Sequence, residues 1–371
     1  MVRGKHFRTL IKTPFLREGF SLKKFWGRIF GRKIVSKKPM VFEKEAPRLS
    51  KVATPVVWPS GENNWEAVAT FNPAAINLGG KIHLLYRAIG RDSVSRIGYA
   101  VSDDGIRFKK YHRPVYEVSL DYMPDDCVLE KRFVSSYWCY SFGCEDPRVT
   151  KIEDDSKIYM CYVFFSGRSN PRIALTSIST QDFAKKWNWE EPRIVSPPGI
   201  TVKSACILPE KIDGNYVVFF RIFPSIFIDF VKDLKDLDGS TRFLQPEYEI
   251  PPRKGTWDSL KIGMGAPPIK TREGWLGIYY GVDEKDPYYR YRIGAMLLDL
   301  KDPTRVVCRS KTPILEPESP YEGRIAYPCG AVLRNDKLYV YYGANDMFVC
   351  VATAYIDEFL DGLLNHSKTI F

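Results

Sequence analysis

Hydrophobic and polar residues alternate in short runs along this chain, and the runs recur in one order. Alternation with a period of two is typical of β-strands. Each repeat opens with a string that contains proline, continues through a short strand and a turn with Gly or Asp, and reaches a strand rich in aromatic residues. The opening strings are residues 71–75, 145–148, 205–209, 265–268 and 327–330.

The spacing of these strings predicts the architecture. They lie about 60–75 residues apart, which is typical of a four-stranded propeller blade with its loops. A third strand follows in several repeats, at 96–101, 172–177, 292–298 and 348–354. We therefore expect an all-β fold, a five-bladed β-propeller. A Greek-key sandwich is the alternative, but the constant order and phase of the repeats favour the propeller.

Propeller geometry predicts where polar residues meet. The opening strings belong to the innermost strands, which gather around the central axis. Asn72, Asp146 and Lys203 should therefore lie together with the residues near Gly265 and Pro328. The predicted organisation is a basic N-terminal extension (residues 1–50), a propeller catalytic domain (51–358) and a C-terminal tail (359–371).

Charge is distributed very unevenly. Residues 1–38 contain twelve Lys or Arg and one acid, Glu18, an excess equal to the net charge of +11 for all 371 residues. The remainder is close to neutral. A nucleic-acid-binding protein would carry basic residues across its folded face, so we expect no nucleic-acid partner.

The basic segment contains a short amphipathic stretch. In a helix over residues 21–30, one face would carry Leu22, Phe25, Trp26, Ile29 and Phe30 beside three cations. Such a face suits peripheral contact with an anionic membrane through residues 1–38. The alternative is a flexible arm that packs on the propeller or on a second subunit of a homo-oligomer, because glycine weakens the helix.

No apolar run approaches the ~18–20 residues of a spanning helix, and the start lacks the pattern of a secretion signal. We expect a cytoplasmic protein, with contact at the inner membrane surface as the peripheral option. The eight cysteines are scattered and form no metal-binding spacing, so no metal site is expected and reduced thiols are favoured. None of the four histidines lies in an opening string.

The string Glu145-Asp146-Pro147-Arg148 is the strongest chemical signal, because the proline restricts how the preceding carboxylate is presented. With it, the chain resembles the β-mannoside phosphorylases, glycoside hydrolase family 130 and its relatives, from about residue 58 to 356. The matching strings are Trp65-Glu66, Phe71-Asn72-Pro73, Leu85-Tyr86-Arg87-Ala88, 97–102 with Asp104-Gly105, 145–148, 208–212, 265–269 with 274–276, 278–282, and 342–344 with Asp346.

The resemblance implies a five-bladed propeller and the reversible, inverting cleavage of a β-mannoside by inorganic phosphate, which yields α-mannose 1-phosphate. It also implies roles for individual residues. Asp146 is the general acid, which acts through a sugar hydroxyl. The mannose subsite corresponds to Asn72, Arg87 and Asp346. The phosphate site corresponds to Arg172, Lys203 and Tyr280. The partners implied are a β-mannoside oligosaccharide and phosphate as co-substrate, with no other cofactor.

These residue types suit that chemistry. An inverting hydrolase needs an acid and a separate base that activates water. Phosphate is already a nucleophilic anion, so a phosphorylase needs one acid and a cationic cradle, and guanidinium groups bind phosphate well. The chain departs from the family at two positions. Phe220 and Tyr280 stand where many members have histidine near the anion, although a tyrosine can still donate a hydrogen bond.

Other functions remain open at this point. The same residues suit a β-mannosyltransferase that uses a nucleotide sugar or mannose 1-phosphate as donor. A β-mannoside hydrolase is disfavoured because family hydrolases carry acids where Arg172 and Lys203 stand. A non-catalytic sugar-binding propeller is disfavoured because Asp146 is retained beside these cations. The linkage cleaved, β-1,4 or β-1,2, has no readable signature.

Overall fold

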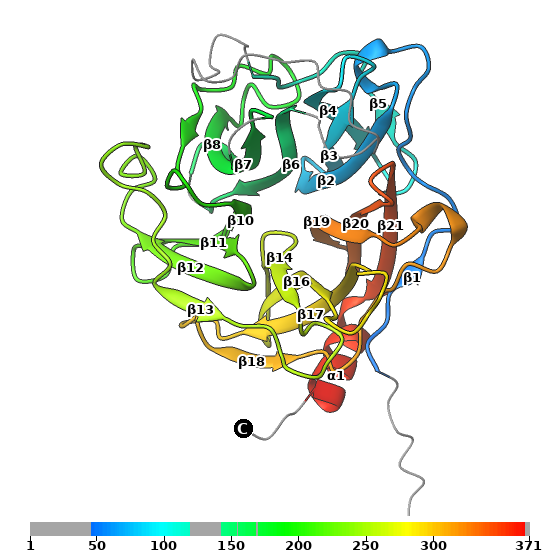
Figure 1. The fold of residues 1–371 in the computed structure, drawn as a ribbon, viewed down its shortest axis with the longest axis vertical. Helices are drawn as coiled ribbons and strands as arrows, with labels where there is room; N and C mark the ends of the chain where they lie inside the picture. The colour runs from blue at the N-terminus through cyan, green and yellow to red at the C-terminus, as the bar shows by residue number, and fades with distance from the viewer. Residues whose placement is uncertain (1–45, 119–141, 154, 168–169, 368–371) are drawn as a thin grey trace, which may run out of the picture. The chain divides into compact units, whose positions relative to one another are not determined.

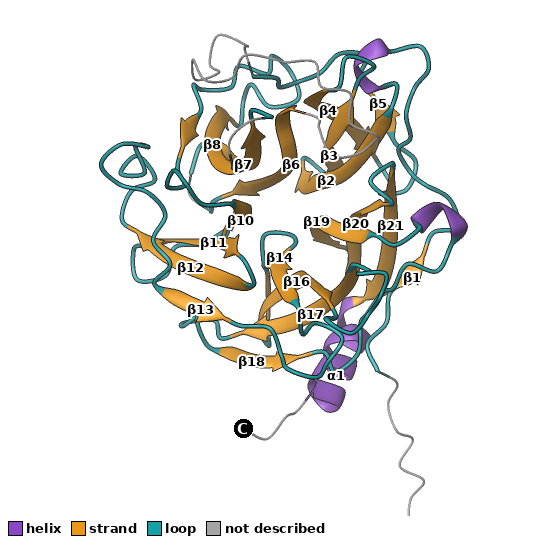
Figure 2. Cartoon of the chain, viewed as in Figure 1, coloured by secondary structure: helices purple, strands orange, loops and turns teal. Residues whose placement is uncertain are grey.

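The computed structural model describes residues 46–118, 142–153, 155–167 and 170–367. Most of the predicted basic extension, including residues 1–38 with their suggested membrane contact, lies outside these residues, as do Cys127, Cys139 and the last four residues of the predicted tail. The described residues confirm the all-β class. Strands dominate throughout, and the only α-helix there is α1 (Ile356–Ser367). Figure 2 shows this distribution.

The strands form five antiparallel units of similar design. The first strand pairs with the second and the second with the third, as the sequence pattern predicts. Figure 1 shows the first strands, β2, β6, β10, β14 and β19, nearest the middle of the described fold. The bounds, unit by unit, are β2 (Ala69–Leu78), β3 (Lys81–Ile89), β4 (Val94–Ser102) and β5 (Lys109–Lys110); β6 (Phe142–Lys151), β7 (Lys157–Phe165), β8 (Arg172–Ser179) and β9 (Arg193–Ile194); β10 (Val202–Ile207), β11 (Tyr216–Ile222), β12 (Ser225–Val231) and β13 (Tyr248–Ile250); β14 (Lys261–Met264), β15 (Ile269–Thr271), β16 (Gly274–Val282), β17 (Arg292–Leu298) and β18 (Val306–Arg309); β19 (Ala326–Arg334), β20 (Lys337–Ala344), β21 (Phe348–Tyr355) and β1 (Ser50–Lys51).

Two features vary this plan. In the fourth unit, β14 and β15 both pair with β16, so a break at residues 265–268 divides the first strand. The first and second units are joined by a short parallel pairing of β4 with β6. The opening strings lie within the first strands, at their ends or, in the fourth unit, in the break between β14 and β15. The aromatic runs that follow them form the second strands.

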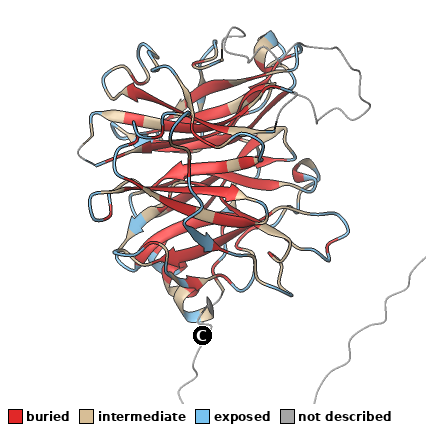
Figure 3. Ribbon diagram, turned by 60° about the vertical axis from the view of Figure 1, so that its left-hand side comes forward, coloured by how far each residue is buried: buried red, intermediate tan, exposed pale blue. Residues whose placement is uncertain are grey.

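Hydrophobic contacts link the five units in a cycle. One buried cluster lies between the first and second units, and others lie between the second and third, third and fourth, and fourth and fifth units. The cycle is completed by a cluster that joins the fifth unit to the first. Both faces of a strand are thereby covered, and every residue of β16 is buried. This explains the nearly continuous apolar runs in the second strands, and Figure 3 shows the strands of the fold as mostly buried.

Helix α1 packs against the fourth and fifth units. Phe359, Leu360 and Leu363 share one face of the helix and join the buried cluster between those units. The spacing of three and four residues places these side chains on one side, as expected of an amphipathic helix. The segment that the sequence assigned to a tail from residue 359 thus lies largely in this helix.

A β-bulge interrupts the first strand in four units. The pairing register shifts between Phe71 and Ala74, Glu145 and Arg148, Lys203 and Cys206, and Pro328 and Gly330. A bulge inserts an extra residue, which bends the strand and redirects a side chain. The repeated proline-containing strings thus mark bulges, and these bulges build the site described below.

The N-terminal strand β1 completes the fifth unit by pairing with β21. Its Lys51 reaches the fully buried carboxylate of Glu322, with an Nζ–Oε2 distance of 2.9 Å. The hydroxyl of Tyr342 donates to the other oxygen of Glu322 at 2.8 Å. One buried carboxylate thereby holds the first described strand to the last unit.

Replacing Lys51 with Met should lower the free energy of unfolding, because Glu322 would lose its cationic partner. Breaking a fully buried pair costs roughly 3–5 kcal/mol, and the partial exposure of Lys51 reduces the expected loss to about 2 kcal/mol. Lys81→Met is the matched control, since its pair with Asp103 is exposed, and it should cost less than about 1 kcal/mol. Urea denaturation measures both, and equal losses would contradict the role of Lys51.

Candidate active site

Three of the bulges place a residue in the left-handed backbone region. Asn72, Asp146 and Ser204 have φ values of 46°, 48° and 58°. Asn and Asp tolerate this region better than most residues, whereas other side chains adopt it at a cost of order 1 kcal/mol or more. Such conformations persist where the surrounding structure holds them, and they often occur at functional sites. The shared geometry brings these residues, which are far apart in sequence, into one neighbourhood.

The first group of polar residues, here called the acid cluster, consists of Asn72, Arg87, Glu145, Asp146 and Asp346. The amide of Asn72 donates to Oδ1 of Asp146 at 2.8 Å. The guanidinium of Arg87 donates to the same Asp146 oxygen at 3.3 Å and to Oε1 of Glu145 at 2.9 Å. One cation is thus shared by two adjacent, buried carboxylates.

The two aspartates of this cluster have opposite pKa shifts. Burial alone would raise the pKa of Asp146, but Arg87, Arg148, Lys203 and the hydrogen bond from Asn72 outweigh it and lower this pKa. Burial of the Asp346 carboxyl group raises its pKa to about 6, with Arg87 opposing the rise and Asp146 and Glu145 adding to it. Two neighbouring carboxyl groups with separated pKa values can divide the roles of proton carrier and anion.

The position of Asn72 depends on a glycine. A Cβ atom at Gly343 would lie 1.9 Å from Oδ1 of Asn72, far closer than side-chain atoms approach one another. Oδ1 of Asn72 is itself buried without a hydrogen-bond partner. The string Tyr342-Gly343-Ala344 therefore leaves space for Asn72, and the free oxygen is suited to accept a hydrogen bond from a ligand.

The second group, here called the cationic cluster, consists of Lys203, Arg221, Lys261, Tyr280 and Tyr291. Lys203 on β10 is the register partner of Arg221 on β11. Nζ of Lys261 donates to the hydroxyl of Tyr291 at 2.6 Å. The rings of Tyr280 and Tyr291 lie 5.6 Å apart. Three cations and two phenols from the third and fourth units therefore face one another.

This cluster has the electrostatic character of an anion site. Burial lowers the pKa of Lys261, with Tyr280 opposing this and Arg221 and Lys203 adding to it. Burial would raise the pKa of Tyr280, but Arg221, a hydrogen bond from Ser204, Lys261 and Arg148 lower it. Nε of Arg221 is buried without a partner. An anion bound here would satisfy that donor and relieve the repulsion between the cations.

The two clusters adjoin through Glu145. Its Oε2 lies 3.5 Å from Nζ of Lys203, while its Oε1 pairs with Arg87. The acid and the cations are thus neighbours, as one buried carboxylate facing a cationic cradle would require. Six of the seven site residues predicted from the sequence belong to these two clusters: Asn72, Arg87, Asp146, Lys203, Tyr280 and Asp346.

Arg172 is the seventh, and its contacts lie elsewhere. Its guanidinium donates to the carbonyl oxygen of Ser196, with an Nε–O distance of 3.1 Å. It also lies over the ring of Phe243, 5.8 Å from the ring centre. Within the described residues, no hydrogen bond or ion pair joins Arg172 to either cluster.

Sequence reasoning missed Arg221, Lys261 and Glu145. Two signals pointed to them. Arg221 interrupts the apolar string of β11, and Lys261 precedes the fourth opening string much as Lys203 precedes the third. The pairing of Arg87 with Glu145, in contrast, depends on contact between two units and has no local signature.

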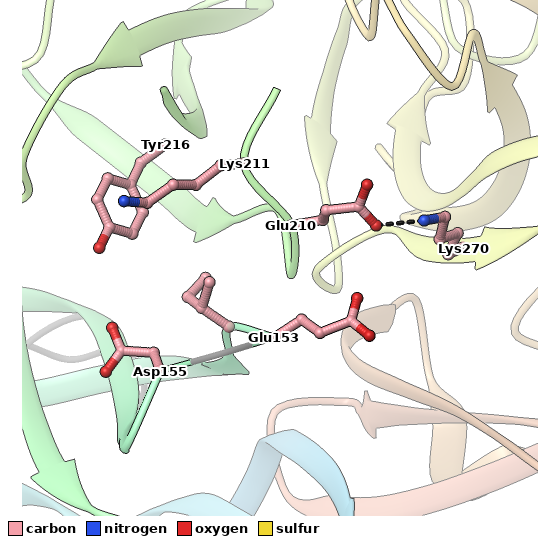
Figure 4. Close-up of a pocket in the computed structure, with 7 residues that line it drawn as sticks. Glu153, Asp155, Glu210, Lys211, Tyr216 and Lys270 are labelled. Carbon is pink, nitrogen blue, oxygen red and sulfur yellow. Dashed lines mark hydrogen bonds and ion pairs between the residues drawn. The ribbon is translucent and has the colours of Figure 1, made fainter. Parts of the chain in front are cut away.

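A pocket of about 430 Å³ lies at the opposite ends of the strands that carry Asp146 and Lys203. Figure 4 shows Glu153, Asp155, Glu210, Lys211, Tyr216 and Lys270 around it, with an ion pair between Glu210 and Lys270. The turn after β6 and the segment after β10 provide most of this lining. It contains none of the residues of the two clusters, so pocket size alone does not locate the candidate site.

The structure bears on three further expectations. Within the described ranges, no group of three or more His, Cys, Asp or Glu side chains is arranged to hold a metal ion. The cysteines of those ranges are buried and free of disulfides. The search for a helix long and apolar enough to cross a membrane, made over the same residues, found none.

Comparison with known families agrees with this geometry. The family model described as β-1,4-mannooligosaccharide phosphorylase, glycoside hydrolase family 130, matches residues 41–365. The chain therefore belongs to glycoside hydrolase family 130. This match confirms the resemblance seen in the sequence.

Individual family 130 proteins are similar over most of the chain. Two come from Thermoanaerobacter sp. (strain X514). A 1,2-β-oligomannan phosphorylase is 39% identical over 80% of this chain and 94% of its own length. A β-1,2-mannobiose phosphorylase is 39% identical over 82% of this chain and 96% of its own. The solved β-1,2-mannobiose phosphorylase of Listeria innocua has a TM-score of 0.66 and 26% identity, and covers 85% of this chain and 99% of that one.

Substitutions of Arg221 and Arg172 distinguish two alternative anion sites. Arg221→Met should weaken the binding of inorganic phosphate about tenfold or more, because a charge-assisted contact is worth roughly 1.5–3 kcal/mol. Arg172→Met, the matched control, should change phosphate affinity less than twofold if the anion binds in the cationic cluster. Isothermal titration calorimetry measures both affinities. A larger loss in Arg172→Met would return the anion site to the residue that the sequence resemblance indicated.

Proposed function

We propose that this chain catalyses the reversible, inverting phosphorolysis of β-mannosides to α-mannose 1-phosphate. The observation that carries the proposal is the adjacency of the two clusters, in which Glu145 contacts Arg87 on one side and Lys203 on the other. A buried carboxyl group beside a cationic cradle is what cleavage by phosphate needs. Family membership and the phosphorylases at 39% identity support this assignment.

The proposed site sits on a five-bladed β-propeller with inorganic phosphate as co-substrate. The cyclic packing of the five antiparallel units supports this architecture. Asn72, Arg87 and Asp346 bind the hydroxyl groups of the mannosyl unit. Lys203, Arg221, Lys261 and Tyr280 hold phosphate on the opposite side of the reacting carbon. The predicted membrane contact, the homo-oligomer and the cytoplasmic location remain predictions.

In the proposed reaction, a phosphate oxygen attacks the anomeric carbon while the bond to the glycosidic oxygen breaks. Asp146 supplies the proton that the departing oxygen takes up, by way of a sugar hydroxyl, and becomes a carboxylate. The configuration at carbon 1 inverts because phosphate enters from the side opposite to the leaving group. Microscopic reversibility lets the same groups run synthesis, with Asp146 then accepting the proton.

The charges around Asp146 suit its proposed release and uptake of a proton. In the free protein, Arg87, Arg148, Lys203 and Asn72 lower the pKa of Asp146 against the effect of burial, which favours its carboxylate form. A phosphate anion bound by Lys203 and its neighbours offsets part of that positive charge, so the pKa of Asp146 should rise as the site fills. Phosphate binding and protonation of the acid are therefore expected to support each other.

The linkage is proposed to be β-1,2. The proteins named for β-1,2-linked mannosides are 39% identical to this chain, whereas a β-1,4-mannooligosaccharide phosphorylase from Ruminococcus albus is 29% identical over 67% of this chain.

A β-mannoside hydrolase is the second candidate function. One similar structure, with a TM-score of 0.67, comes from work that describes hydrolases of β-1,2-mannosidic linkages within family 130.

One experiment tests the reaction and the linkage together. The purified protein is incubated with β-1,2- and β-1,4-mannobiose, each with and without inorganic phosphate, and the products are identified by NMR. We expect α-mannose 1-phosphate from the β-1,2 disaccharide only when phosphate is present. Equal release of free mannose with and without phosphate would favour the hydrolase, and a preference for the β-1,4 disaccharide would overturn the linkage.

Replacing Asp146 with Asn should abolish the supply of the proton while preserving the hydrogen bonds of the cluster. The loss of a positioned general acid typically lowers the rate about 10²–10⁴-fold. p-Nitrophenyl β-mannoside has a leaving group that needs little protonation, so the variant should lose much less activity on it. Steady-state rates on both substrates, with thermal unfolding as a check of folding, make the comparison. Near-normal turnover of mannobiose would exclude Asp146 as the acid.

A further inference from the structure

Arg148 is a buried arginine whose contacts lead to both clusters. It is 1% exposed, although an arginine is rarely buried to this extent. Its guanidinium donates to the carbonyl oxygens of Gly265 and Asp146, each at 2.9 Å, through Nε and Nη1 respectively. Nη2 donates to the hydroxyl of Tyr327 at 3.2 Å. One side chain from the second unit therefore contacts the fourth and fifth units.

No carboxylate side chain is among the hydrogen-bond partners of Arg148 in the described part of the chain. Its positive charge is compensated by two carbonyl oxygens, one phenol and the face of the Tyr327 ring, 5.7 Å from the guanidinium carbon. A buried charge that lacks an ion-pair partner is costly. A neutral side chain of similar volume would avoid that cost, so the retained cation calls for a role beyond packing.

Hydrogen bonds extend from Arg148 into the cationic cluster. The hydroxyl of Tyr327 is 3.0 Å from Oγ of Ser204, and the same Oγ is 3.1 Å from the hydroxyl of Tyr280. Ser204 is the left-handed residue of the third bulge, as Asp146 is of the second. The path Arg148–Tyr327–Ser204–Tyr280 therefore connects the backbone that presents the acid to a phenol of the anion site.

We propose that Arg148 is a positioning residue. It fixes the backbone carbonyl group of Asp146 by a hydrogen bond, and it orients Tyr280 through Tyr327 and Ser204. These contacts keep the acid and the anion site in a constant relative position. This inference rests on the proposed function. It assigns Arg148 no contact with the substrate. The residue acts through the backbone of Asp146 and through the phenol of Tyr327.

The charge of Arg148 acts in the same direction as its hydrogen bonds. It contributes to the lowered pKa of Asp146 and to that of Tyr280. The other groups around Asp146 are Arg87, Glu145, Lys203, Tyr327, Cys329, Asp346 and the amide of Asn72. All of these are retained when Arg148 alone is changed, so a shift in the pH profile can be attributed to Arg148.

The test uses the whole chain and compares Arg148→Met with Arg148→Lys. At saturating phosphate, the alkaline limb of kcat/KM for mannobiose reports loss of the acid proton from the phosphate-bound enzyme. Without the Arg148 charge, Asp146 should hold its proton to higher pH, so the limb of Arg148→Met should move upward by about one pH unit. Arg148→Lys keeps the charge but loses the three-way hydrogen bonding, so its limb should stay in place while kcat falls about tenfold or more.

Arg309→Lys is the control for a generic buried arginine. Arg309 pairs with the buried Asp258 at 2.6 Å, and neither residue belongs to the two clusters. This variant should lose stability without any change in the pH limb or in the KM for phosphate. The inference would be overturned if Arg148→Met lost stability but kept the wild-type limb, since Arg148 would then resemble Arg309.

If the Arg148 variants do not fold, Tyr327→Phe tests the hydrogen-bonded path from Arg148 to Tyr280. This variant preserves the ring and removes only the bridging hydroxyl. We expect the KM for phosphate to rise about threefold to tenfold, as for one lost hydrogen bond, with the KM for mannobiose within twofold of wild type. An unchanged KM for phosphate would refute the path to Tyr280. Failure of the wild-type protein to cleave any mannobiose with phosphate would instead count against the proposed function, which separates the two outcomes.

Discussion

The bulged first strand is the constraint on which the candidate site depends. A regular strand alternates its side chains between two faces, and in this fold both faces pack against neighbouring units. The bulges at Asn72, Asp146 and Ser204 break that alternation. Each one redirects a polar side chain away from the apolar contacts between units. Because the bulge recurs at the same place in successive units, Asn72 and Asp146, 74 positions apart, become hydrogen-bond partners.

Charge balance then determines what these neighbours can do. Arg87, Arg148 and Lys203 act on the carboxyl groups of the acid cluster, and Arg221 and Lys261 add positive charge beside Lys203 and Tyr280. The acid cluster has one cation, Arg87, for three carboxyl groups, whereas the cationic cluster has three cations with phenols in place of carboxylates. A positive imbalance in a poorly hydrated place favours an anion, and Nε of Arg221 is left free to donate to one. The cations near Asp146 likewise favour its carboxylate form.

Tyr280 has an unusual electrostatic environment in the cationic cluster. Arg221, Lys261 and the hydroxyl of Ser204 lower the pKa of Tyr280 against the effect of burial, so its hydroxyl is a strong hydrogen-bond donor. Lys261 and Tyr291 add a further cation and a second phenol to the same cluster. The cationic cluster thus contains several groups suited to an anion.

The sequence by itself determined the all-β class and the five repeats, and it singled out the string around Asp146, because alternation, turn residues and proline-containing strings are local signals. It also led to six of the residues that the structure gathers in the two clusters. Only the tertiary structure decided which groups pair: Arg87 with Glu145, Lys203 beside the same carboxylate, and Arg148 with carbonyl oxygens from two units. Likewise it placed Arg172 beside Ser196 and brought in Arg221 and Lys261. Such pairings depend on strand register and on contacts between units, and no local pattern encodes a distance across the fold.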